Sequence, residues 1–235
     1  MIKSELEKLL IDTFEIKDQS TLDSLYVYYK TLVETSKVMN LTTIVELEEA
    51  YIKHFYDSLL LSKTIDLTKN LTLADVGTGA GFPGLVLKIV YPNLHVTLIE
   101  PITKRCKFLQ SVIDKLQLKD IYVINGRAED VIKEYREYFD IVTARAVAAL
   151  NILAEICVPF VKLNGVFIAL KGSSYQEEID TAGLAFSKLK AKYSSKHVFE
   201  LPKNMGERAI ILYKKIDKTP NIYPRIYAKI KKNPL

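Results

Sequence analysis

The chain has 235 residues, of which 49% are hydrophobic and 26% are charged. This balance is ordinary for a soluble globular protein, and the length suits one α/β domain of about 150 residues with an extension. Because no run of ~18 uninterrupted apolar residues is present, we expect no membrane-spanning helix. The charged first residues lack the apolar core of a secretory signal. We therefore expect a cytoplasmic protein without membrane contact.

The cysteines and histidines narrow the chemistry further. Cys106 and Cys157 stand in apolar, helix-like surroundings, which predicts buried thiols rather than a disulfide. The three histidines have no cysteine cluster nearby, so the sequence predicts no metal site.

The net charge of +5 is concentrated at one end of the chain. Residues 214–235 contain seven basic residues and one acid, a net charge of +6, which leaves −1 for the first 213 residues. Such a segment suits a phosphate backbone, but it is equally compatible with a solvated tail that only aids solubility.

Residues 1–67 are expected to be helical and to pack on the domain that follows. Two sets of apolar residues recur at helical spacing: Leu22, Leu25, Tyr26, Tyr29, Leu32 and Val33, and then Leu47, Ala50, Tyr51, His54, Phe55 and Leu59. The stretch 38–43 between them predicts a loop. His54 stands beside Asp57 and Ser58 on the second helix, a spacing that could suggest a catalytic triad. A structural histidine, or one at a substrate edge, is the better interpretation, because no nucleophile turn surrounds Ser58.

Residues 71–90 read as a strand, a glycine turn and a helix. The apolar run 71–76 includes Asp75 near its end, and four glycines follow within eight residues: Gly77, Gly79, Gly81 and Gly84. This order presents free backbone N–H groups to a bound cofactor. Read from Gly79, the spacing is the dinucleotide fingerprint G-x-G-x-x-G; read from Asp75, it resembles motif I of S-adenosylmethionine-dependent methyltransferases. A tight packing turn without a ligand is the third interpretation.

The next two strands carry polar groups at their carboxyl ends. Residues 95–99 form the second predicted strand, and Glu100 at its tip is suited to accept hydrogen bonds from a ribose diol. A helix is expected over 104–118. The third strand, 121–125, runs into a polar turn in which Ala128 and Glu129 would flank an adenine ring. The alternative for this turn is a simple helix start whose acids favour the helix dipole.

A fourth strand, 139–144, is followed directly by Arg145. An arginine at this rim can hold a carboxylate or a phosphate by two hydrogen bonds, and a surface salt bridge is the alternative. A helix over 152–161 and a fifth strand over 165–170 come next, and Lys171 follows that strand.

The chain is expected to close with a polar helix over 175–193 and strands over 196–201 and 208–213. A short connection between these strands demands antiparallel pairing. The predicted fold is therefore α/β: a class I, Rossmann-like methyltransferase with a seven-stranded, mostly parallel sheet, a C-terminal antiparallel hairpin and an N-terminal helical extension. This ending favours the motif I register. The expected parts are 1–67, the extension; 68–215, the cofactor-binding domain; and 216–235, a basic tail.

Several motifs together resemble the RsmG (GidB) family over nearly the whole chain and in the same order. They are Asn40-Leu41-Thr42, the His54/Asp57-Ser58 helix, residues 75–84, Lys104-Arg105 with Phe108-Leu109, Arg127-Ala128-Glu129, Ala144-Arg145-Ala146 and Lys171-Gly172. The resemblance implies methyl transfer from S-adenosylmethionine to N7 of one guanosine in the 530 loop of 16S rRNA. It also implies a cofactor pocket that includes Gly77, Phe82, Ala128, Glu129 and Arg145.

Taken together, the residues and the resemblance define two expected sets of site residues. The cofactor set is Asp75, Gly77, Gly79, Gly81, Phe82, Glu100, Ala128, Glu129 and Arg145; the RNA set is Lys171, Arg225, Lys229, Lys231 and Lys232. The expected partner is 16S rRNA or a small-subunit particle, and the expected state is a monomer. Guanine N7 carries a lone pair in the neutral base, so no general base is expected.

Two alternatives remain open at this point. One is an S-adenosylmethionine-dependent methyltransferase with a small molecule or a protein as substrate. The other is a nucleotide- or NAD-binding module, or a dehydrogenase, that uses the G-x-G-x-x-G register.

Overall fold

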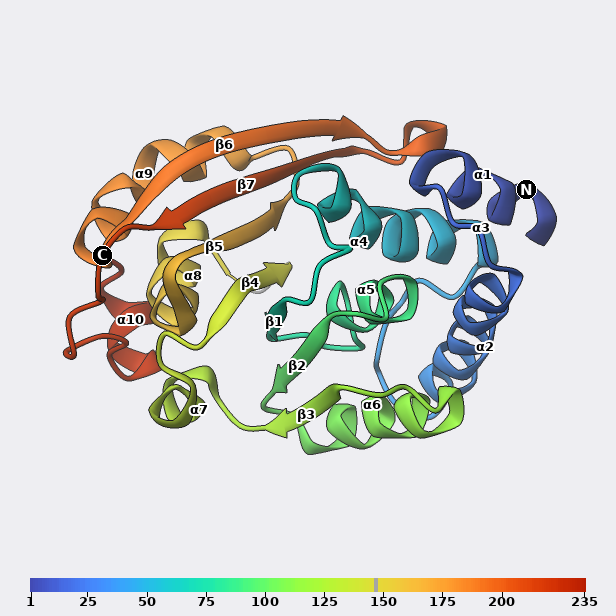
Figure 1. Ribbon diagram of the computed structural model, residues 1–235, viewed down its shortest axis with the longest axis horizontal. Coiled ribbons are helices and arrows are strands. Elements are labelled where there is room, and N and C mark those ends of the chain that lie inside the picture. Colours follow the sequence, from blue (N-terminus) through green and yellow to red (C-terminus); the bar gives the residue numbers. More distant parts are fainter. Residues whose placement is uncertain (146–147) are drawn as a thin grey trace.

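The computed structural model describes residues 1–145 and 148–235, and its centre is one seven-stranded sheet (Figure 1). The strand order is β3-β2-β1-β4-β5-β7-β6. The strands are β1 (Thr72–Val76), β2 (His95–Glu100), β3 (Ile121–Asn125), β4 (Phe139–Arg145), β5 (Val161–Lys171), β6 (Ala191–Glu200) and β7 (Glu207–Lys215). The first five run parallel, whereas β7 pairs antiparallel with both β5 and β6. The predicted sheet and its closing hairpin are confirmed.

Helices cover both faces of this sheet. They are α1 (Lys3–Phe14), α2 (Gln19–Ser36), α3 (Leu47–Ala50), α4 (Asp57–Leu59), α5 (Gly84–Val90), α6 (Thr103–Leu116), α7 (Ala128–Tyr135), α8 (Leu150–Cys157), α9 (Tyr175–Lys188) and α10 (Tyr227–Lys232). Alternate residues of a strand point to opposite faces, so Leu73 joins the core under α2, α5 and α6, while Ala74 joins the core under α8, α9 and α10. Each face thus buries its own apolar cluster.

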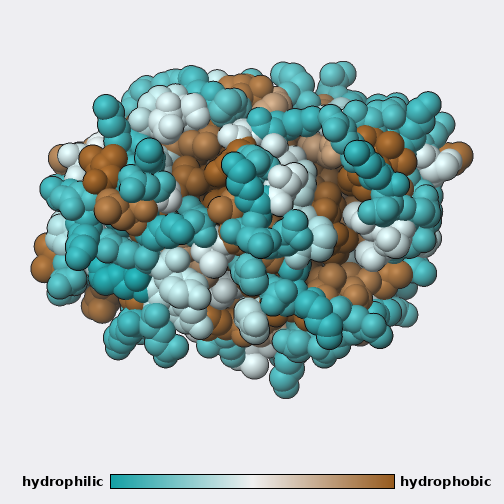
Figure 2. All heavy atoms as spheres, in the orientation of Figure 1, coloured by the Kyte–Doolittle hydropathy of each residue, from teal (hydrophilic) through white to brown (hydrophobic). Residues whose placement is uncertain are grey.

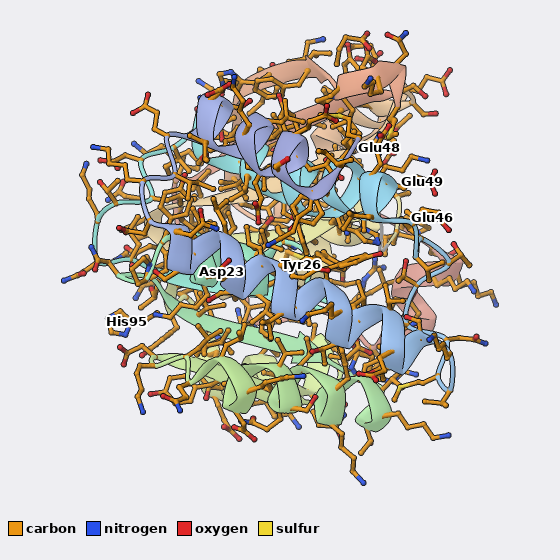
Figure 3. The ribbon with its side chains drawn as sticks, turned by 90° about the vertical axis from the view of Figure 1, so that its right-hand side faces the viewer. Asp23, Tyr26, Glu46, Glu48, Glu49 and His95 are labelled. Atoms are coloured by element: carbon orange, nitrogen blue, oxygen red, sulfur yellow. The ribbon has the colours of Figure 1, made fainter. Side chains whose placement is uncertain are left out.

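The N-terminal helices pack on the sheet through α5 and α6. Helix α2 contacts both of them, and its Tyr28 is fully buried, with its ring stacked on Phe82 at 5.5 Å between centroids. A π-helical segment, Tyr51–Tyr56, joins α3 to α4. Figure 3 shows α2 along the outside of this layer with Asp23 and Tyr26 on it, and the acids Glu46, Glu48 and Glu49 together at α3.

Two predicted helices end early, and the strands that follow them begin earlier than expected. The helix predicted over 175–193 ends at Lys188, because Lys190 takes a left-handed conformation with φ of +64°, and β6 begins at Ala191. Strand β6 is an edge strand with alternating exposed residues, so its lysines and serines resemble a polar helix in the sequence. The helix predicted over 152–161 likewise ends early, and β5 begins at Val161.

The C-terminal segment, residues 216–235, is docked on the domain. Thr219 donates its backbone N–H to Glu137 Oε1 (2.8 Å) and its hydroxyl to the carbonyl of Leu189 (2.9 Å). Ile230 of α10 is fully buried in the cluster under α8 and α9. In Figure 1, α10 (red) lies beside α8.

Three further observations describe the chain as a whole. Cys106 and Cys157 are both buried free thiols, as predicted. Within residues 1–145 and 148–235, no helix combines the length and the apolar character needed to cross a bilayer. On the face shown in Figure 2, apolar residues show between polar side chains that cover much of the surface.

Candidate cofactor and acceptor site

The glycines of the loop after β1 have separate tasks. Gly79 has φ of +62°, and a Cβ atom built on it meets no heavy atom within 4 Å, because the residue faces a cavity. Gly81 has φ of +104°, and a Cβ there would lie 2.6 Å from the hydroxyl of Tyr28 and 2.9 Å from Leu85 Cβ. Glycine at both positions avoids the penalty of a left-handed backbone. Gly79 therefore leaves the backbone exposed to a ligand in the cavity. Gly81 instead leaves room for Tyr28 of the N-terminal helices to pack against the loop.

Asp75 supports this loop from below. Its side chain is fully buried, and Oδ2 accepts hydrogen bonds from the Thr78 hydroxyl (2.6 Å) and from the backbone N–H of Gly84 (2.8 Å). Burial raises the pKa of Asp75 to about 6, although both hydrogen bonds act in the opposite direction. Asp75 and Gly81 do not line the cavities described below, so the structure locates these two expected cofactor residues behind the loop.

Glu100 stands at the carboxyl end of β2 and faces the glycine loop. The residue is 2% exposed; Oε2 accepts the backbone N–H of Gly79 and Oε1 that of Ile102, each at 2.9 Å. Each carboxylate oxygen has a second lone pair. Glu100 thus ties the loop to β2 and can still accept hydrogen bonds from a ligand.

Two cavities meet at the glycine loop. The larger, about 390 Å³, has the following wall: Leu41, Thr42, His54, Gly77, Thr78, Gly79, Ala80, Phe82, Glu100, Pro101, Ile102, Arg105 and Arg145. The smaller, about 190 Å³, shares Gly77 and Pro101 with it and extends to Ala128 and Glu129. The larger cavity by itself is within the range of about 300–1,000 Å³ that is typical of small-molecule sites, and the smaller one adjoins it. Bare backbone at Gly79 and the buried Glu100 carboxylate fit a nucleoside with a diol, and therefore fit S-adenosylmethionine.

Arg145 links this site to the N-terminal helices. Its Nη1 donates to Asp57 Oδ2 (2.9 Å) and to the carbonyl of Lys53 (3.0 Å), and its Nη2 donates to His54 Nδ1 (3.3 Å). The guanidinium also lies over the ring of Phe82, 4.9 Å from its centroid. Its partner Asp57 is buried and also pairs with Arg208 (3.2 Å).

His54 has the structural environment that the sequence favoured. Its ring stacks on Phe82 with centroids 4.2 Å apart, and Nε2 lies 3.1 Å from the Thr42 hydroxyl. Burial, reinforced by the charge of Arg145, lowers the pKa of His54 to about 3, so the ring is neutral near pH 7. Ser58 donates to the backbone carbonyl of His54 (2.6 Å) rather than to the imidazole, which rules out a triad.

A third cavity, about 420 Å³, lies on the other side of Arg145 and His54. It is lined by Ile44, Lys53, His54, Asp57, Arg145, Leu170, Lys171, Gly172, Glu178 and Arg208. Four of these residues are cationic. Sequence reasoning missed Arg208, because nothing in the local pattern of its strand marks it and only the fold brings it to Asp57.

The residues expected to contact RNA divide into two groups. Lys171 pairs with Glu178 (2.6 Å) and donates to the carbonyl of Ala148 (2.6 Å), and Arg225 forms a two-point ion pair with Glu155 (2.8 and 2.6 Å). For both residues the RNA contact stays a prediction, and the ion pairs within the protein compete with it. Lys229, Lys231 and Lys232 are exposed on α10.

One residue of the tail was not expected at this site. Tyr227 at the start of α10 lines the smaller cavity together with Ala128 and Glu129. Its place among lysines in the sequence suggests stacking on RNA bases instead. Ala146, the last residue of the Ala144-Arg145-Ala146 motif, lies outside the described residues.

The sheet order and the site at the carboxyl ends of its strands define a class I S-adenosylmethionine-dependent methyltransferase. Solved structures share this fold: M. jannaschii TYW2 in complex with AdoMet (TM-score 0.54, 18% identity, covering 69% of this chain and 76% of that one) is similar. So is a putative sarcosine dimethylglycine methyltransferase from Galdieria sulphuraria (TM-score 0.55, 13% identity, 74% and 89% covered). At these identities the likeness shows the fold alone.

The particular family is shown by the sequence. A family model, GidB, described as rRNA small subunit methyltransferase G, matches residues 21–209, and the chain belongs to this family. Proteins named ribosomal RNA small subunit methyltransferase G are 45% identical in Bacillus licheniformis (91% of this chain, 90% of that protein) and 47% identical in Staphylococcus saprophyticus (88% and 87%). Membership confirms the motif I register and argues against a dinucleotide dehydrogenase.

Proposed function

We propose that the protein transfers the methyl group of S-adenosylmethionine to N7 of a guanosine in the 530 loop of 16S rRNA. It would act in the cytoplasm, as a monomer, on bare rRNA or on a small-subunit particle. One observation supports the proposal beyond family membership: Arg145 and His54 line both the larger cavity, which has nucleoside-binding features, and the third cavity, whose wall holds four cationic and two acidic residues. A methyl donor and a nucleotide acceptor would meet at that boundary.

The cofactor side of the proposal rests on the glycine loop and its neighbours. Glu100 would accept hydrogen bonds from the ribose diol, and the backbone from Gly77 to Gly79 would lie against the amino-acid part of the cofactor. Ala128 and Glu129 would flank the adenine ring. Asp75 and Gly81 would shape the loop without touching the ligand, in keeping with their hydrogen bonds and close contacts.

Arg145 is suited to the methionine carboxylate or to an RNA phosphate. Three of its five N–H groups are used by Asp57, Lys53 and His54. Within the described part of the chain the remaining two have no hydrogen-bond partner, and they can serve an anionic ligand. The contacts to Asp57 and His54 would hold the guanidinium beside Phe82 while it does so.

The acceptor side needs positive charge around the RNA backbone and neutral surroundings at the base. Lys53 and Arg208 line the third cavity; each also pairs with a carboxylate, Glu49 (2.6 Å) and Asp57 (3.2 Å), and would exchange part of that contact for a phosphate. The target guanosine must leave its stack to reach the site, as single-stranded loops and flipped bases do. His54, which is neutral near pH 7, can border the purine without opposing the positive charge that develops on it.

Catalysis of this reaction requires alignment of the two reactants more than it requires proton transfer. When bound, S-adenosylmethionine supplies an electrophilic methyl group on its sulfonium centre. Guanine N7 has a free lone pair and attacks without losing a proton, so the chain needs no general base. Its residues would hold the two reactants in line, which alone can account for a large part of the rate.

Methylation mapping tests this proposal. The protein is incubated with methyl-labelled S-adenosylmethionine and either deproteinised 16S rRNA or small-subunit particles, and N7-methylguanosine is located by cleavage at the modified base. We expect one modified guanosine, in the 530 loop. Gly79→Val, whose side chain would enter the cavity, serves as the negative control. Label on another base, or on protein and not on RNA, would contradict the proposal.

A further inference from the structure

The C-terminal segment reaches the cofactor site through one aromatic side chain. Tyr227 forms part of the wall of the smaller cavity, together with residues at or just after the ends of β1, β2 and β3. Its ring lies under the guanidinium of Arg127, with Cζ 5.8 Å from the centroid. Figure 1 shows α10 close to both α7 and α8, the two helices that border this cavity.

The position of Tyr227 is fixed by its neighbours in the chain. Two residues before it, Arg225 holds both carboxylate oxygens of Glu155, and its backbone N–H also donates to Oε1 (2.8 Å). Three residues after it, Ile230 is fully buried. Glu155 is itself 0% exposed, and a buried carboxylate is costly without a partner. Undocking of this segment would leave the buried carboxylate of Glu155 unpaired, so the ion pair favours the position of Tyr227 at the cavity.

The other walls of the cavity suit a flat aromatic ligand. Val76, Ile99, Pro101, Ala128 and Ile156 supply apolar surface, and the backbone at Gly77 and Gly126 adds no side chain. A planar ring between this surface and a tyrosine gains from stacking as well as from burial. A purine has this shape.

We propose that Tyr227 contacts the adenine ring of the cofactor, so that residues 216–235 complete the cofactor pocket. This inference rests on the proposed use of S-adenosylmethionine, and it assigns to the C-terminal segment a role separate from RNA binding. The nucleoside part of the ligand would be enclosed by the loop after β3 on one side and by α10 on the other.

A tryptophan reporter tests the contact directly. The chain contains no tryptophan, so Tyr227→Trp places a single indole at the cavity. We expect its fluorescence to change on titration with S-adenosylhomocysteine and to saturate at the dissociation constant found by calorimetry. Tyr122→Trp is the matched control, since Tyr122 is 62% exposed and lines a different cavity; its emission should not respond. An unresponsive Tyr227→Trp protein that still binds the ligand would overturn the inference.

Affinity measurements identify which part of the ligand is touched. Tyr227→Ala should weaken binding of both S-adenosylhomocysteine and adenosine by about 5- to 160-fold, the range for a lost base-stacking aromatic. Tyr227→Phe should stay within about twofold of the wild type, because the ring remains. Ile222→Ala, at an exposed residue of the same segment, should change neither affinity. Weakened binding of S-adenosylhomocysteine with unchanged binding of adenosine would refute the adenine contact.

The two proposals fail in different ways. Wild-type protein that binds no S-adenosylhomocysteine would overturn both of them. Wild-type protein that binds the ligand with the same affinity as Tyr227→Ala would overturn only the inference about α10 and would leave the proposed methyl transfer intact.

Discussion

The two ends of the chain both reach the cavities of the candidate cofactor site, but they are joined to the domain by different contacts. The N-terminal helices are joined to the domain mainly by buried aromatic contacts, such as the stacking of Tyr28 and His54 on Phe82, to which Asp57 adds ion pairs with two arginines of the sheet. The C-terminal segment is joined by the ion pair of Arg225 with Glu155, by the hydrogen bonds of the buried Thr219, and by the buried Ile230. One end borders the larger cavity and the other end borders the smaller one.

This difference predicts how each end responds to change. Added volume destabilises close aromatic packing, whereas loss of one partner destabilises a buried ion pair because it leaves an unpaired charge. A change of shape should therefore damage the N-terminal contact most, and a change of charge should damage the C-terminal one. The following variants are designed to break that comparison, beginning with the largest expected effect.

Gly81→Val should cost about 3–5 kcal/mol of folding stability, since it combines a left-handed backbone with a side chain that meets Tyr28. Urea denaturation measures the loss. Gly79→Ala is the control: it shares a positive φ but meets no atom within 4 Å, so it should destabilise by only about 1 kcal/mol. Equal losses in the two variants would mean that the approach of the N-terminal helices does not determine the glycine at position 81.

Arg225→Ala should cost about 3 kcal/mol, because it leaves the carboxylate of Glu155 buried and unpaired. Glu155→Gln combined with Arg225→Ala removes the stranded charge and should recover part of the loss. The free energy of unfolding of both variants supplies the check. If the double variant were no more stable than Arg225→Ala alone, burial of an unpaired charge would not be the cause.

The N-terminal contact should also weaken in acid through His54. Its pKa in the folded protein is about 3 against an ordinary value of 6.5, so below about pH 6.5 the unfolded chain binds a proton that the folded chain rejects. Stability is therefore lost as the pH falls, by about 2 kcal/mol at pH 5. Asp75 has the opposite sign: its pKa is raised to about 6, and its contribution is lost as the pH rises through that value.

Comparison with His54→Gln separates these two effects, since Asp75 is common to both proteins. The stability difference between the wild type and the variant should fall by about 2 kcal/mol between pH 7 and pH 5. A difference that does not change with pH would show that His54 titrates normally in the folded protein.

Local patterns in the sequence were sufficient for most of the sheet and for the glycine loop. The strand, turn and helix over 71–90 lie side by side in the chain, so their periodicity and their glycines report directly on their structure. The edge strand β6 was partly mistaken for a helix, because an exposed strand rich in lysine and serine has a weak apolar pattern.

Contacts between segments that are distant in the chain could not be predicted from such local patterns. Asp57 is shared by Arg145 and Arg208, and the sequence pointed only to its neighbours on its own helix. The lysines around Tyr227 indicated a charged tail, whereas the buried Glu155 that anchors this tail lies within an apolar helix. These residues acquire their roles only when the chain folds.

The smallest expected effect concerns the exposed lysines of α10. Replacing Lys229, Lys231 and Lys232 by glutamine should reduce the salt dependence of RNA binding, lowering the slope of log K against log[salt] by up to about 2 for a single-stranded target. Anisotropy of a labelled 530-loop RNA over a series of salt concentrations measures this slope. Affinity for S-adenosylhomocysteine should not change, because Tyr227 and the Arg225–Glu155 pair are intact.

Deletion of residues 218–235 is a less specific experiment than this triple replacement. The deletion would remove Tyr227 from the smaller cavity, leave Glu155 without its arginine and remove the basic charge, so a loss of activity would have three explanations. The triple glutamine variant changes charge alone. An unchanged salt slope in that variant would mean that α10 makes no phosphate contacts, and the C-terminal segment would then serve the cofactor pocket without serving RNA.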